Sequence, residues 1–114
     1  MANKFNSSDY RNKAVFQRRT LIEDEYGATS MEWSDTTRAG VSIRQISMRE
    51  SHSAGIEITE EVLRLTAPAH KGLFEVLHTD RVMVSGGYFS IIQIDKFDPQ
   101  NRFITFVVRR IQGD

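Results

Sequence analysis

The sequence predicts an all-β fold, a small antiparallel β-barrel of about six strands with one long loop between two of its strands. Segments rich in β-branched and aromatic residues recur along the chain and are separated by Gly, Pro, Asn or Asp. No segment has the periodicity of a long amphipathic helix. The 114 residues, 39% of them hydrophobic, are enough for one domain and too few for two. A closed barrel fits because closure leaves no exposed sheet edge.

Charge and cysteine content exclude several classes of protein. Lys plus Arg and Asp plus Glu number 15 each, which argues against a surface tuned as a whole for nucleic acid or an anionic membrane. A neutral chain also lacks self-repulsion, so association is expected. The absence of cysteine excludes disulfides, thiolate catalysis and sulfur-ligated metals, and it suits a reducing cytoplasm. No apolar run approaches the roughly 20 residues of a membrane-spanning helix.

The beginning of the chain differs in composition from the rest. Residues 1–12 are rich in Asn, Ser and charge, and they contain no apolar stretch that resembles a signal peptide. We expect them to form a flexible N-terminal arm. Residues 13–114 are then expected to form the single barrel domain.

Two strands joined by a hairpin turn are predicted next. The first begins at Ala14 and ends before Gly27, which can supply the positive φ that a hairpin turn or bulge needs. The chain returns through residues 29–44. Alternation near the end of this segment places Val41 and Ile43 on one face of the strand.

A long loop is predicted between the second and third strands. Residues 45–55 interrupt the alternation, and about eleven residues exceed the usual connection between strands. Loops of this length tend to be functional or disordered. A short helical turn over residues 47–52 remains an alternative. The loop residues are Gln45, Ile46, Ser47, Met48, Arg49, Glu50, Ser51, His52, Ser53, Ala54 and Gly55.

The third strand spans residues 56–67 and is ended by Pro68. Its alternation places Leu63, Leu65 and Ala67 on one face. The following segment, residues 69–78, fits either a helical turn or an irregular crossing.

Three further strands complete the barrel. Residues 81–84 form a short strand with Val82 and Val84 pointing inward, and a Gly-Gly turn follows it. Residues 88–96 and 102–111 form the last two strands, joined by a turn that contains Asp, Pro and Asn.

The last strand is apolar on both faces, although a small barrel needs only one face for its core. The second face is expected to pack either on residues 69–78 or on another subunit. Both alternatives stay open. One face carries Phe103, Thr105 and Val107, and the other carries Ile104, Phe106 and Val108.

No arrangement of residues predicts catalysis, a metal site or a cofactor. His52, His70 and His78 lack metal-ligand spacing. The neighbours Ser51 and His52 do not form a triad motif. The glycines at 86–87 lack the Lys-Ser/Thr and the helix of a phosphate loop. We therefore expect no enzyme activity and no cofactor.

Arginines come in groups and suit phosphate contacts. Solvated strand faces on which they pair with nearby Glu and Asp explain them better, because alternating aromatic and basic residues of a nucleic-acid platform are missing. The groups are Arg18 with Arg19, Arg44 with Arg49, and Arg109 with Arg110.

Several short motifs, in order and spacing, resemble the head–tail adaptor proteins of long-tailed phages and prophages, also called head-closure or stopper proteins. The resemblance covers about residues 11–111. It rests on residues 11–18, 24–27, 32–33, 39–44, 79–82, 87–88, 91–95 and 102–110, with Glu50 in the loop. The positions that define the fold within it are Tyr26, Gly27, Trp33, Asp80, Arg81, Gly87, Tyr88 and Asp95.

The resemblance implies a structural virion protein, assembled in the bacterial cytoplasm, that forms a ring between portal and tail. The ring would close the filled capsid and join head to tail. On this hypothesis residues 45–55 project into the channel, where Arg49 contacts packaged double-stranded DNA. The implied partners are the portal ring, tail proteins and further copies of the chain, with no membrane. Alternatives are a tail-completion or tail-terminator protein and a small nucleic-acid-binding barrel.

Overall fold

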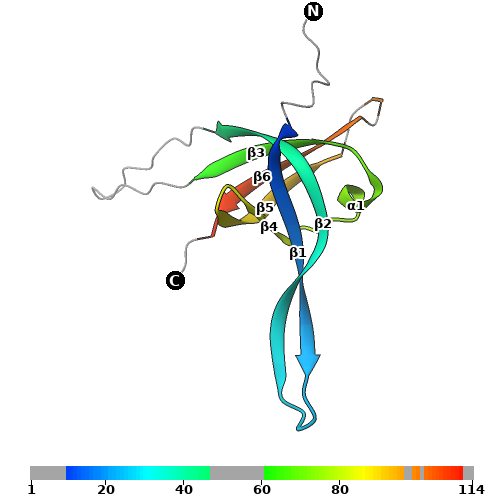
Figure 1. The fold of residues 1–114 in the computed structure, drawn as a ribbon, viewed down its shortest axis with the longest axis vertical. Coiled ribbons are helices and arrows are strands. Elements are labelled where there is room, and N and C mark those ends of the chain that lie inside the picture. Colours follow the sequence, from blue (N-terminus) through cyan, green and yellow to red (C-terminus); the bar gives the residue numbers. More distant parts are fainter. Residues whose placement is uncertain (1–9, 47–60, 97–98, 101, 112–114) are drawn as a thin grey trace, which may run out of the picture.

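In a computed structural model of the chain, six antiparallel strands form one sheet that closes on itself (Figure 1). The structure describes residues 10–46, 61–96, 99–100 and 102–111. Around the barrel the strands lie in the order β1-β2-β3-β6-β5-β4, and pairing of β4 with β1 closes it. The predicted all-β barrel of about six strands is confirmed. The elements are β1 (Asn12–Glu23), β2 (Thr29–Ile46), β3 (Val62–Pro68), α1 (Lys71–Phe74), β4 (Arg81–Val84), β5 (Gly87–Asp95) and β6 (Phe103–Arg110).

The core follows from the two-residue period of the strands, which turns alternate side chains inward. The rings of Phe16 and Phe106 meet inside the barrel with centroids 4.9 Å apart. The predicted apolar faces are confirmed, because their side chains are buried: Leu63, Leu65 and Ala67 in β3, and Val82 and Val84 in β4. The buried cluster comprises Ala14, Phe16, Val41, Leu63, Leu65, Ala67, Leu73, Val76, Val82, Val84, Phe89, Ile91, Ile104, Phe106 and Val108.

The segment left open between a helical turn and an irregular crossing contains the short helix α1. Leu73 of this helix and Val76 after it are buried in the same cluster as the inward face of β6. The outward face of β6 receives Tyr10, whose ring stacks on Phe103 at 6.1 Å. Residues 69–78 thus contribute Leu73 and Val76 to the core and do not cover the outward face of β6 at Phe103, where Tyr10 lies.

The start of the long loop was placed too early. Gln45 and Ile46 belong to β2, where they pair with Leu63 and Val62. A polar side chain such as Gln45 does not end a strand while a backbone partner remains beside it. The other predicted loop residues, 47–55, lie outside the described residues, and β1 begins at Asn12, the last residue of the predicted N-terminal arm.

The hairpin between β1 and β2 projects from the barrel, as Figure 1 shows. Pairing with β4 involves only residues 15–17 of β1, and pairing with β3 involves only residues 42–46 of β2. Residues 18–23 and 29–34 pair only with each other. We call residues 18–34 the hairpin arm.

The tip of the hairpin arm is a tight turn. Gly27 has a φ of +82°, the positive value predicted for it. The backbone N–H groups of Tyr26 and Ala28 both donate to the Asp24 carboxylate at 2.9 Å. The N–H of Gly27 donates to the Asp24 carbonyl at 3.1 Å. Asp24 therefore fixes the turn with its side chain and its backbone.

Candidate assembly surface

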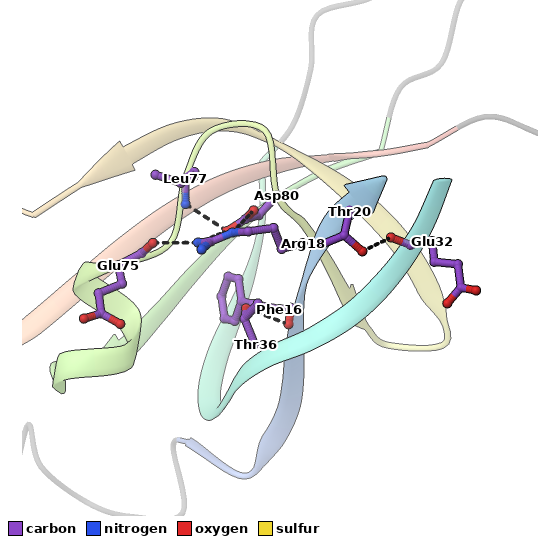
Figure 2. Close-up of polar contacts among 8 residues, drawn as sticks. All are labelled: Phe16, Arg18, Thr20, Glu32, Thr36, Glu75, Leu77 and Asp80. Atoms are coloured by element: carbon purple, nitrogen blue, oxygen red, sulfur yellow. Dashed lines mark hydrogen bonds and ion pairs between the residues drawn. The ribbon is translucent and has the colours of Figure 1, made fainter. Parts of the chain in front are cut away.

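On one side of the hairpin arm, Arg18 joins its root to the segment before β4 (Figure 2). Its Nε and Nη2 donate to the two carboxylate oxygens of Asp80, each at 3.0 Å, and Nη2 also donates to the Glu75 carbonyl at 2.9 Å. The Leu77 N–H donates to the same carboxylate at 2.9 Å. Such a bidentate Arg–carboxylate pair fixes the orientation of the guanidinium as well as its distance from the carboxylate.

The attraction between Arg18 and Asp80 is strong because the Asp80 side chain is fully buried, where water screens the charges little. A buried carboxylate is stable only when it is paired and hydrogen-bonded. The hydrogen bond with Asp80 raises the pKa of the Arg18 guanidinium, partial burial opposes this, and the charges of Asp80 and Glu75 reinforce it. Arg18 thus stays charged and holds β1 against the turn before β4.

On the other side of the root, Arg81 lies between two aromatic rings. Its guanidinium carbon is 4.2 Å from the centroid of Trp33 and 4.0 Å from that of Tyr88. The Arg81 Nε also donates to the amide oxygen of Gln17 at 2.8 Å. The stack connects β2, β4 and β5 through cation–π contacts.

A chain of hydrogen bonds continues from this stack along the outer surface. Gln17 donates to the Asp35 carboxylate at 2.8 Å, and Arg38 donates to the same carboxylate at 3.3 Å. These hydrogen bonds, first that of Gln17 and then that of Arg38, lower the pKa of Asp35. The root of the hairpin arm is therefore fixed on both of its faces, which sets the direction in which the arm leaves the barrel.

The hairpin arm carries exposed apolar side chains along one face. Leu21 and Met31 are direct cross-strand partners, and they are 71% and 52% exposed. Arg19 and Trp33 are the next partners on the same face, because side chains two residues apart point the same way. A two-stranded hairpin alone is marginally stable in water, so an uncovered apolar face favours contact with another protein.

The structure brings three of the predicted fold-defining residues, Trp33, Arg81 and Tyr88, together in one stack. The others are distributed around the barrel. Tyr26 and Gly27 form the tip of the hairpin arm. Asp80 forms the ion pair with Arg18. Asp95 ends β5, where it pairs with Thr105 of β6. Gly87 lies so close to Arg110 that a Cβ atom there would meet its guanidinium.

Sequence reasoning missed the roles of Arg18 and Gln17. Arg18 was grouped with Arg19 as a basic pair, and pairing with acids on the folded surface was favoured for such pairs. Arg18 does pair with an acid, but that acid is the buried and distant Asp80, whereas Arg110 forms a partly exposed pair in which its Nε donates to Glu61 at 2.7 Å. No local signal identifies Asp80 as the partner, because 62 residues separate it from Arg18.

Within residues 10–46, 61–96, 99–100 and 102–111, no group of three or more His, Asp or Glu side chains is placed to hold a metal ion. The helix in this part of the chain is also too short to cross a membrane.

The fold and the hairpin arm define a small all-β protein with a projecting, exposed surface suited to protein contacts. The sequence profile of the phage head completion proteins matches residues 5–111, so the chain belongs to that family. This confirms the resemblance inferred from the sequence and supports a structural role in completing the phage head. The comparison with curated proteins finds no match.

Two solved structures share the fold. One is a chain from the virion of a native gene transfer agent particle, with a TM-score of 0.61 and 13% identity, covering 87% of this chain and 93% of that one. The other is protein SF1141 from Shigella flexneri 2a, with a TM-score of 0.66 and 22% identity, covering 93% and 96%. These identities establish similarity of fold alone.

Proposed function

We propose that the chain forms a ring between portal and tail, closes the filled capsid and joins head to tail. The observation that carries the proposal is the family match over residues 5–111. The projecting hairpin arm with its exposed Leu21 and Met31 supports it, because an assembly protein acts through surfaces that only its partners cover. The fold that this chain shares with one from a gene transfer agent virion fits a virion location.

Residues 47–55, the part of the predicted loop that follows β2, are proposed as the part of the subunit that faces the DNA channel. Ile46 and Val62 are cross-strand partners, so the connection between β2 and β3 leaves and re-enters the barrel at one place. Such an insertion can project from the barrel without altering its core. Arg49 would meet DNA phosphates there, and the mechanism would be steric, with no bond chemistry.

Removing the gene product from the assembling particle tests the function. Heads made without the chain should package DNA, then lose it, and remain free of tails in electron micrographs. Adding the purified chain to such heads should restore tail attachment. Tailed, DNA-filled particles that form in the complete absence of the chain would contradict the proposal.

Deleting residues 47–53 tests the assignment of the loop. The barrel should still fold, because the deleted residues lie between β2 and β3 and outside the described core. Heads completed with this variant should join tails and yet release DNA. A variant that no longer melts cooperatively, or that retains DNA as well as the unmodified chain does, would count against the assignment.

A further inference from the structure

The outer half of the hairpin arm is both aromatic and acidic. Tyr26 at the tip is 88% exposed. Residues 20–32 contain four of the chain's 15 acidic side chains and no Lys or Arg. The rest of the chain therefore carries 15 basic side chains against 11 acidic ones. A neutral protein is thus divided into an acidic projection and a basic body.

A surface pocket of about 340 Å³ lies where β1 and β2 run together on the barrel, away from the tip. Lys13 and Arg38 provide its cations, and the Arg38 side chain is 75% exposed. Arg38 forms an ion pair with Asp35 at 3.3 Å, but this is an exposed i,i+3 pair. Because such pairs contribute little, the Arg38 guanidinium remains available to a stronger acceptor. The lining residues are Lys13, Ala14, Val15, Arg38, Ala39 and Gly40.

The tip and the pocket of one molecule cannot meet. Lys13 and Glu23 lie near opposite ends of the same strand, ten residues apart, which at 3.3 Å per residue is a separation of about 33 Å. The hairpin arm is also fixed at its root by Arg18 on one face and Arg81 on the other. Contact between the two surfaces must therefore be made between two molecules.

We propose that the tip of the hairpin arm of one copy docks in this pocket of the next copy. The Tyr26 ring would lie against Val15, with Lys13 and Arg38 at its edge, and Glu25 would face Lys13. An aromatic side chain, small apolar walls and opposite charges are complementary in shape and in potential. Occupation by a second copy is favoured because the acidic tip and the basic pocket belong to the same neutral chain.

The contact between copies is heterologous, since the tip and the pocket are different parts of the subunit. Such contacts generate a ring when the rotation between copies closes. The inference rests on the proposed ring function and deepens it by naming the surfaces through which neighbours meet. Many copies of a modest contact give a stable assembly.

Cysteine cross-linking tests the contact directly, because the chain has no cysteine of its own. The variant with Glu25→Cys and Lys13→Cys keeps Tyr26 and replaces the expected charge pair with a thiol pair. The matched control carries Glu25→Cys and Arg64→Cys, since Arg64 is an exposed basic residue on β3, away from the pocket. Particles assembled with each variant are oxidised and examined by non-reducing electrophoresis.

We expect a ladder of disulfide-linked multimers for the Lys13 variant, containing most of the chain, and monomers for the control. Oxidised particles in which the Lys13 variant joins heads to tails and stays monomeric, or in which Glu25→Cys links to a different protein, would overturn the inference and leave the proposed function standing. Particles that contain none of the unmodified chain at the head–tail junction would overturn both.

A charge exchange adds a readout independent of thiol geometry. Glu25→Lys and Lys13→Glu should each lower the yield of tailed particles, and the two together in one chain should restore it. A double variant as defective as the worse single variant would contradict the contact between these two side chains.

Discussion

Replacing Arg18 with alanine should destabilise the barrel more than any other change of an arginine at the root of the hairpin arm. The variant loses two hydrogen bonds to the Asp80 carboxylate and one to the Glu75 carbonyl. Among the described residues, the Leu77 N–H is then the one donor left to the buried Asp80 carboxylate. Breaking a fully buried pair costs about 3–5 kcal/mol. The Arg18 side chain is 38% exposed, so water can partly replace it. We therefore expect a loss of about 2–3 kcal/mol.

Thermal unfolding followed by circular dichroism measures this loss. For a chain of 114 residues, about 4 °C in Tm per kcal/mol corresponds to a decrease of about 10 °C. Arg19→Ala is the matched control, because Arg19 is exposed and lies 5.8 Å from the Trp33 ring with no buried partner described. It should change the free energy of unfolding by less than about 0.5 kcal/mol.

The result that would refute this reasoning is an Arg18→Ala variant whose Tm lies within about 2 °C of that of the unmodified protein. A double-mutant cycle with Asp80→Ala isolates the pair. The combined variant should lose less than the sum of the two single variants, because removing both partners leaves no unpaired charge in the interior.

Three other predictions concern the surface, the titration and the packing. Leu21→Glu should leave Tm unchanged within about 2 °C, because the side chain is already exposed. It should reduce tail joining, because a protein that covers this face in the particle would lose an apolar contact. A fall in Tm without loss of joining would refute this. Gln17→Ala should move the pKa of Asp35 up toward its usual range, as read from carboxyl shifts in an NMR titration. The depressed pKa implies stabilisation that is present above the unfolded value and lost as pH falls through the folded one, and an unmoved pKa would exclude Gln17 as its cause. Gly40→Val should destabilise by about 1–3 kcal/mol in urea unfolding, because its Cβ would meet the Tyr10 carbonyl; unchanged stability would contradict that packing.

Local patterns predict much of the barrel. Two-residue alternation identifies the core faces of β3 and β4, because a strand buried on one side must turn alternate residues inward, whereas β6 is apolar on both faces and its core face follows only from the structure. Gly27 marks the tip of the hairpin for a reason confined to a few residues, its positive φ. The four-residue helix α1 is too short to show a helical period, so the sequence of residues 69–78 does not distinguish a helical turn from an irregular crossing, and the burial of Leu73 is seen only in the structure.

The projection of the hairpin arm could not be predicted in the same way. Whether a strand belongs to the barrel or extends beyond it depends on where β3 and β4 stop pairing, and both are distant in sequence. The same holds for Arg18 and Asp80, whose contact joins two segments with no common motif. Gln45 and Ile46 were assigned to the loop because their polarity pattern changes, although the backbone pairing of β2 continues.

Electron cryomicroscopy of the head–tail junction, in the particle whose genome encodes this chain, tests the central claim most directly. We predict a ring of six-stranded barrels between portal and tail, with each hairpin arm extending to the next copy. A junction without this barrel fold, or with the chain placed elsewhere in the particle, would contradict the proposed role.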